Sequence, residues 1–138
     1  MQAPGTTVNP RPEERAMPTL AFIFCETRPT HPDPAPTGDW TGEARFLLDP
    51  AQDLHAALEA ADVAGRGHPD DLSVQVSAEA LFEDGHITGQ TVLSAADLAT
   101  LTAHLPELHH PRIMAWAAFA YALDSQGQNT RFILWFVE

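Results

Sequence analysis

The sequence of 138 residues contains no lysine, a single cysteine and no long apolar run. Cys25 alone cannot form an internal disulfide, which favours a reducing compartment, so we expect a cytoplasmic protein. No stretch approaches the roughly 20 apolar residues of a membrane-spanning helix. The first residues also lack the apolar core of a signal peptide. The sequence therefore predicts no membrane association.

Basic residues are scarce as well, because seven arginines stand against 19 aspartates and glutamates, for a formal net charge of −12. Nucleic-acid binding requires a basic face that neutralises phosphates, and an anionic membrane surface attracts proteins through the same kind of face. The composition argues against direct nucleic-acid binding and against membrane binding. It allows a basic protein partner.

Motifs of nucleophilic, phosphate-binding and dinucleotide-binding enzymes are absent from the sequence. The glycine-containing segment 65–70 ends in an acidic residue, which is unsuited to holding phosphate. The adjacent carboxylates Asp70–Asp71 and Glu83–Asp84 could act as acid/base pairs only in a cleft and are interpreted as solvated turn residues. We therefore expect a protein that is not an enzyme and that uses no cofactor and no metal.

Histidines keep one alternative open. His104, His109 and His110 lie around a proline break, and Glu107 adds a carboxylate. Their spacing matches no recognised zinc motif. The alternatives to a binding module are a small histidine-dependent metal-binding protein or enzyme that uses the His104–His110 segment, and an oligomeric structural domain of unknown role.

Proline is concentrated near the start of the chain, where eight of the 12 prolines lie at or before Pro36. Residues 1–17 are predicted to form a disordered tail, and residues 18–138 are predicted to form one domain. Apolar patterns in this domain predict four strands, at 19–27, 40–48, 72–76 and 131–137. The first strand is apolar on both faces, which predicts a central strand with Cys25 in the core.

Helices are predicted at 49–63, with Asp49 as the N-cap and Pro50 at the first position, and at two later segments that begin at Ser94 and Pro111. A small hairpin is predicted around the Asp84–Gly85 turn. The order of elements predicts an α+β domain, in which a mixed or mainly antiparallel sheet is packed by about three helices.

Acidic residues are concentrated in the middle of the chain. Between Phe46 and Glu107, eleven carboxylates stand against Arg66 alone, which leaves a net charge of −10 there. Burying unpaired carboxylates costs several kcal/mol each, so they are expected at the surface, where their potential attracts a basic cleft. A solvated face that only maintains solubility is the alternative. Trp40, at a loop–strand junction, is the expected exposed aromatic anchor. The candidate partner-binding residues are Asp49, Asp53, Glu59, Asp62, Asp70, Asp71, Glu83, Asp84 and Trp40.

Several segments resemble the ArdA-type antirestriction proteins. They are the strand TLAFIF after Met17-Pro18, the segment Gly38–Trp40, the helix DPAQDLHAALEAAD, and the pair LSAADLATLTAHLPEL and IMAWAAFAYAL, within residues 18–123. The resemblance implies a dimeric, elongated, acidic protein that mimics DNA and blocks type I restriction–modification enzymes. This chain is one domain long, less densely charged and ends in an apolar strand. None of the family's site residues is carried over to it.

Overall fold

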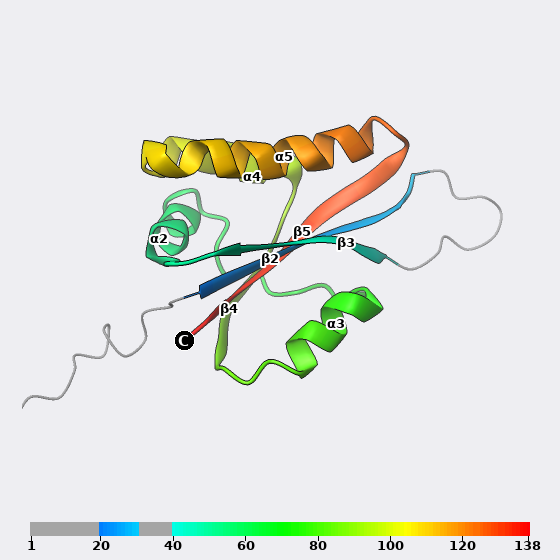
Figure 1. Cartoon of the computed structure of the whole chain (residues 1–138), viewed down its shortest axis with the longest axis horizontal. Helices are drawn as coiled ribbons and strands as arrows, with labels where there is room; N and C mark the ends of the chain where they lie inside the picture. Colours follow the sequence, from blue (N-terminus) through cyan, green and yellow to red (C-terminus); the bar gives the residue numbers. More distant parts are fainter. Residues whose placement is uncertain (1–19, 31–39) are drawn as a thin grey trace, which may run out of the picture.

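The computed structural model describes residues 20–30 and 40–138. The predicted tail, residues 1–17, lies outside the described residues. Four strands form one antiparallel sheet in the order β3-β2-β5-β4 (Figure 1). The strands are β2 (Leu20–Pro29), β3 (Thr41–Leu48), β4 (Ile87–Leu93) and β5 (Gln128–Val137).

Four α-helices pack on this sheet in the described part of the chain, which makes the fold a small α+β domain, as predicted. They are α2 (Gln52–Ala60), α3 (Val74–Leu81), α4 (Ala95–Thr100) and α5 (His110–Asp124). Two short 3₁₀ turns, η1 (Leu101–His104) and η2 (Glu107–His109), join α4 to α5. None of the described helices has the length and apolar character needed to cross a membrane.

The two faces of the sheet are covered unequally. Helices α2, α4 and α5 lie on one face, and α3 lies on the other (Figure 1). In β2, Ile23 and Cys25 point into the core under the three helices, whereas Phe22 and Phe24 point toward α3. Alternate residues of this strand are therefore buried on opposite faces, which confirms the prediction of a central strand with a buried Cys25.

Helix α4 begins as its sequence predicts. The Ser94 hydroxyl accepts a hydrogen bond from Asp97 N at 3.0 Å, and the Asp97 carboxylate accepts one from Ser94 N at 3.0 Å. Together the two bonds satisfy amides at the start of the helix that would otherwise lack partners. The helix predicted to begin at Pro111 is also present as α5, and it buries Ile113, Trp116 and Ala120.

Three sequence predictions are wrong. The expected strand at 72–76 contains the start of α3, because Ser73 caps a helix there by accepting a hydrogen bond from Val76 N at 3.1 Å. The expected hairpin around Gly85 is a turn between the end of α3 and the start of β4. Asp49 does not cap α2, because that helix begins at Gln52 and Ala51 occupies the N-cap position.

Candidate functional site

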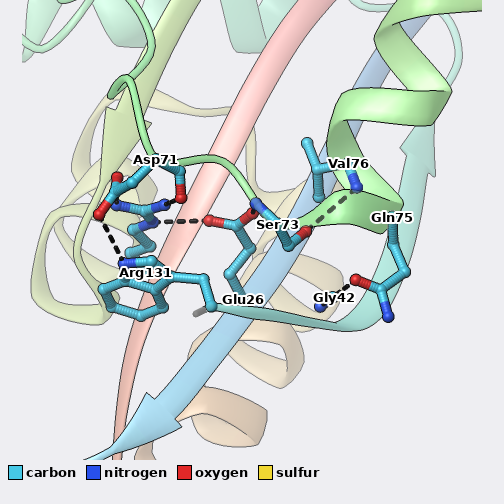
Figure 2. A network of polar contacts seen from close by, with 8 residues as sticks. Glu26, Gly42, Asp71, Ser73, Gln75, Val76 and Arg131 are labelled. Atoms are coloured by element: carbon cyan, nitrogen blue, oxygen red, sulfur yellow. Dashed lines mark hydrogen bonds and ion pairs between the residues drawn. The ribbon is translucent and has the colours of Figure 1, made fainter. Parts of the chain in front are cut away.

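A network of polar side chains lies at one end of the sheet (Figure 2). We call it the polar clamp; its members are Glu26, Trp40, Asp71, Ser73 and Arg131. Glu26 is fully buried, and its carboxylate accepts hydrogen bonds from Arg131 Nε and from Ser73 N, both at 2.6 Å. A buried carboxylate is tolerated only when such partners satisfy it. The pairing of Glu26 with Arg131 across β2 and β5 places the clamp at the end of the sheet where β5 begins.

Asp71 is tied to the same arginine. Arg131 donates to the Asp71 carboxylate and to the Asp71 carbonyl oxygen, both at 3.0 Å, and Trp40 Nε1 donates to the other carboxylate oxygen at 3.2 Å. The hydrogen bond from Arg131 holds the pKa of Asp71 below its usual value. Asp71 is therefore a structural carboxylate that already has its partners.

Trp40 is not the exposed anchor that the sequence predicted. Its side chain is 8% exposed, because the guanidinium carbons of Arg28 and Arg131 lie 4.4 and 4.0 Å from its ring centroid. These cation–π contacts and its hydrogen bond to Asp71 hold the ring within the polar clamp.

The clamp also fixes α3 on the sheet. The Ser73 amide donates a hydrogen bond to the Glu26 carboxylate, and the Ser73 hydroxyl caps α3. Two residues later, Gln75 Oε1 accepts a hydrogen bond from Gly42 N of β3 at 3.3 Å (Figure 2). An eight-residue helix is marginal by itself, so these contacts decide where it begins and where it lies.

The opposite end of the sheet is flanked from both faces by acidic segments. Adjacent residues of a strand point to opposite faces, as Phe136 and Val137 do at the end of β5. The ring of His55 in α2 packs edge-on against Phe136, with centroids 5.2 Å apart. On the other face, the turn at Gly85 lies so close to Val137 that an added Cβ would collide with it. Helix α2 and the turn after α3 therefore flank one end of β5.

Five of the predicted carboxylates lie on these two segments or just before them: Asp53 and Glu59 on α2, Asp49 three residues before α2, and Glu83 and Asp84 in the turn after α3. We call these five residues the acidic end. All are exposed except Glu83, which is half-buried. Asp53 contacts His109 at 2.9 Å, Glu59 lies 4.0 Å from His55, and Glu83 accepts a hydrogen bond from Gly85 N. Within residues 20–30 and 40–138, no arginine forms an ion pair with any of them.

The other predicted acidic residues lie elsewhere. Asp70 is exposed beside Asp71 at the clamp end. Asp62 is exposed in the loop after α2 and has a φ of 62°. The carbonyl of the next residue, Val63, accepts a hydrogen bond from the Thr91 hydroxyl, which places this loop beside β4. The nine candidate residues thus do not form one surface. Arg66 is the one arginine between Phe46 and Glu107 in the sequence. Folding adds a second cation to these carboxylates, because it brings Arg131 to Asp71, 60 positions away in the chain.

The histidines of the 104–110 segment are separated from one another by their contacts. His109 is 8% exposed and faces Asp53, His110 Nε2 lies 2.9 Å from the Leu105 carbonyl oxygen, and His104 is exposed. No cluster of three or more potential metal ligands occurs among the residues that the structure describes. A hollow of about 530 Å³ beside His109 is lined mainly by apolar residues, together with Asp49 and Arg112.

Sequence reasoning missed three members of the clamp, namely Glu26, Ser73 and Arg131. One signal was available, because a glutamate within an otherwise apolar strand must find a buried partner. The identity of that partner depends on the strand order, which the sequence pattern does not supply.

A scan against protein-family models matches no family, and searches of curated proteins and of solved structures find no match. The geometry of the two ends of the sheet is therefore the observation that bears on the function of this protein.

Proposed function

We propose that this protein is a non-catalytic binding module whose acidic end engages a basic protein partner. One observation carries the proposal: carboxylates from α2 and from the turn after α3 flank the same end of β5, and no arginine pairs with them in the described part of the chain. Carboxylates that already have strong cationic partners contribute little to a second interaction. At the acidic end, the exposed Glu59 and Asp84 have no arginine partner among the described residues, and their charge is available for a partner.

The electrostatic potential of the acidic end is expected to affect mainly the rate of association with a partner. Like charges that face solvent at one end of a small protein attract a basic surface and raise the association rate, and salt weakens this attraction. We therefore expect binding that weakens steeply as the ionic strength rises. Substitutions at the acidic end are expected to change the association rate and its dependence on salt.

A basic nucleic-acid enzyme is the partner class that fits best, because its binding cleft is built to accept the negative charges of phosphates. The resemblance to antirestriction proteins points to the same class, with a type I restriction–modification complex as the specific candidate. In this proposal the module acts as an inhibitory decoy that occupies such a cleft.

The first experiment is capture of partners from a host lysate at low salt, followed by elution with rising salt and mass spectrometry. Tagged wild-type protein is compared with the variant Glu59→Arg/Asp84→Arg. These two residues are chosen because both are exposed, and because neither holds the buried His109 as Asp53 does. We expect a basic protein that the wild type retains and the variant does not. Equal recovery on both would exclude the acidic end as the binding surface.

A second experiment addresses the candidate partner class directly. Purified protein is added to a DNA cleavage reaction of a type I restriction enzyme, with the Glu59→Arg/Asp84→Arg variant as the control. Inhibition by the wild type and its loss in the variant would support the decoy. Full cleavage with both proteins would contradict this partner class and leave other basic partners to the capture experiment.

A further inference from the structure

Helix α3 exposes an unusual amount of apolar surface. Three of the seven large hydrophobic residues that are exposed in the described chain lie on this short helix and its C-cap. Val74, Leu81 and Phe82 are 76%, 76% and 78% exposed. Single exposed apolar residues are ordinary, but a contiguous group on one element marks a contact surface.

These residues share one face of the helix. Positions 74, 78 and 81 follow the i, i+4, i+7 spacing that aligns side chains along a helix, and residue 82 lies next to them. We call Val74, Ala78, Leu81 and Phe82 the α3 patch. Val76 is fully buried on the opposite side of the helix, against the aromatic face of the sheet. The α3 patch therefore points away from the protein's own core.

Carboxylates border the α3 patch. A hollow of about 310 Å³ lies between the helix and β2–β3, with Phe22, Ala78 and Phe82 on its apolar side and Glu79, Glu83 and Asp84 on its acidic side. Arg45 also lines it, with its guanidinium 5.4 Å from the Phe22 ring. Glu83 and Asp84 belong to the acidic end as well, so the α3 patch adjoins the part of the acidic end that lies in the turn after α3.

We propose that the α3 patch is the apolar centre of the partner interface, and that it receives an amphipathic segment whose apolar residues are flanked by arginine or lysine. This inference rests on the proposed function and specifies which part of a basic partner binds. Interfaces combine an apolar centre with a polar rim, and here the rim is acidic. An extended or helical segment would place its apolar side chains on Leu81 and Phe82 and its cations against Glu79, Glu83 and Asp84.

The charges around the α3 patch favour a basic amphipathic segment over a second copy of the chain and over an anionic membrane surface. A second copy would bring its own Glu79, Glu83 and Asp84 to the same rim, where like charges repel. An anionic membrane surface would be repelled for the same reason. A basic amphipathic segment satisfies both the apolar patch and the rim.

The outer face of α5 provides a matched control. Met114 and Tyr121 are 45% and 48% exposed and are also seven positions apart on one helix. The only charged residues of α5 are Arg112 and Asp124, near its two ends, so this face has no acidic rim. Removing apolar side chains there changes total hydrophobicity in a similar way but leaves the proposed interface intact.

The test uses the full chain and a synthetic peptide of about 18 residues, with leucines at helical spacing and lysines elsewhere, beside a scrambled peptide of the same composition. Fluorescence anisotropy measures Kd for the wild type, Leu81→Ser/Phe82→Ser and Met114→Ser/Tyr121→Ser. We expect the α3 variant to bind the amphipathic peptide at least about 30-fold more weakly, with an unchanged dependence on salt. The α5 variant is expected to bind as the wild type does, and the scrambled peptide is expected to bind weakly to all three proteins.

Several outcomes would overturn the inference. Equal affinity of the α3 variant and the wild type, or equal binding of the two peptides, would show that the patch contributes nothing specific. Self-association that sedimentation detects in the wild type and not in the α3 variant would assign the patch to a second copy. If Glu59→Arg/Asp84→Arg weakens binding while the α3 variant does not, the proposed function stands and this inference fails. If neither variant weakens binding, both fail.

Folding of the variants is checked by circular dichroism and urea unfolding. Leu81 and Phe82 are more than three-quarters exposed, so their replacement is expected to leave the unfolding midpoint close to that of the wild type. Phe82→Ala by itself serves as a milder second variant, with a smaller expected loss of affinity in the same direction.

Discussion

The two ends of the sheet use the same kind of side chain in opposite ways. At the clamp end, Glu26 and Asp71 are bonded to Arg131, and the carboxylates hold strands and α3 together. At the acidic end, carboxylates of the same chemistry have no arginine partner among the described residues. The net charge of −12 is therefore a poor guide to function by itself. What separates structural carboxylates from available ones is the position of the few arginines.

The largest expected effect comes from breaking the clamp. Arg131→Met leaves Glu26 buried without its cation, and removing one partner of a buried pair typically costs about 3–5 kcal/mol. Urea unfolding of the variant should therefore show a large loss of stability. The double variant Glu26→Gln/Arg131→Met should recover part of it, because the uncompensated charge is gone. A loss below about 1 kcal/mol for Arg131→Met would mean that the clamp is not structural.

The reactivity of Cys25 measures, without a denaturant, how strongly a substitution at each end of the sheet destabilises the fold. Burial, with smaller contributions from Glu43 and other nearby carboxylates, raises the pKa of its thiol to about 12, so the native protein should react slowly with thiol reagents. Arg131→Met should increase the labelling rate at least about tenfold, because the open population rises with the loss of stability. Glu59→Arg/Asp84→Arg should label at the wild-type rate. Similar acceleration in both variants would erase the distinction between the two ends.

A smaller effect is expected at Asp71, whose side chain is 59% exposed. Asp71→Asn should reduce stability by about 0.5–1 kcal/mol at pH 7, as expected for a solvent-exposed ion pair. The lowered pKa of Asp71 means that its contribution is present above the unfolded-state pKa near 3.9 and disappears as the pH falls through the folded-state value. Unfolding measured at successively lower pH should bring the two proteins together. A difference that persists at the lowest pH would show that the ionic contact is not its cause.

The smallest effect is expected from neutralising the acidic end. Glu59→Gln/Asp84→Asn removes two charges that have no arginine partner in the described chain, so stability should change by no more than about 0.5 kcal/mol per site. A slight gain is the expected direction, because repulsion between neighbouring carboxylates decreases. Thermal unfolding at low salt is the most sensitive measurement. A loss as large as that of Asp71→Asn would indicate that the acidic end also holds the fold together.

Much of the architecture could be predicted from local patterns. The apolar run of β2 predicts a strand buried on both faces, and Ser94 with Asp97 predicts the start of α4, because each signal depends on neighbouring residues. The segment 72–76 could not be assigned in this way. Its alternating residues fit a strand, while its serine and later spacing fit a helix, and the contact between Ser73 N and Glu26 spans 47 positions.

The candidate site was predictable to a similar extent. Surface exposure of most of the acidic residues follows from the shortage of cations, because unpaired carboxylates remain in water. Which of these acidic residues are paired with an arginine depends on the strand order, because the strand order determines which arginine lies next to which carboxylate. Trp40 shows the same limit, since Arg131, which covers its ring, lies 91 positions away in the sequence.

The decisive measurement compares two double charge reversals, one at each end of the sheet. Glu59→Arg/Asp84→Arg changes the acidic end, and Asp70→Arg/Asp124→Arg changes two exposed carboxylates near the end of the sheet where β5 begins; each raises the net charge from −12 to −8. Affinity for the basic amphipathic peptide is measured for both variants over a range of salt concentrations. We expect at least about tenfold weaker binding and a shallower salt dependence for the acidic-end variant only. Equal losses in the two variants would contradict this expectation, because net charge rather than the acidic end would then determine binding.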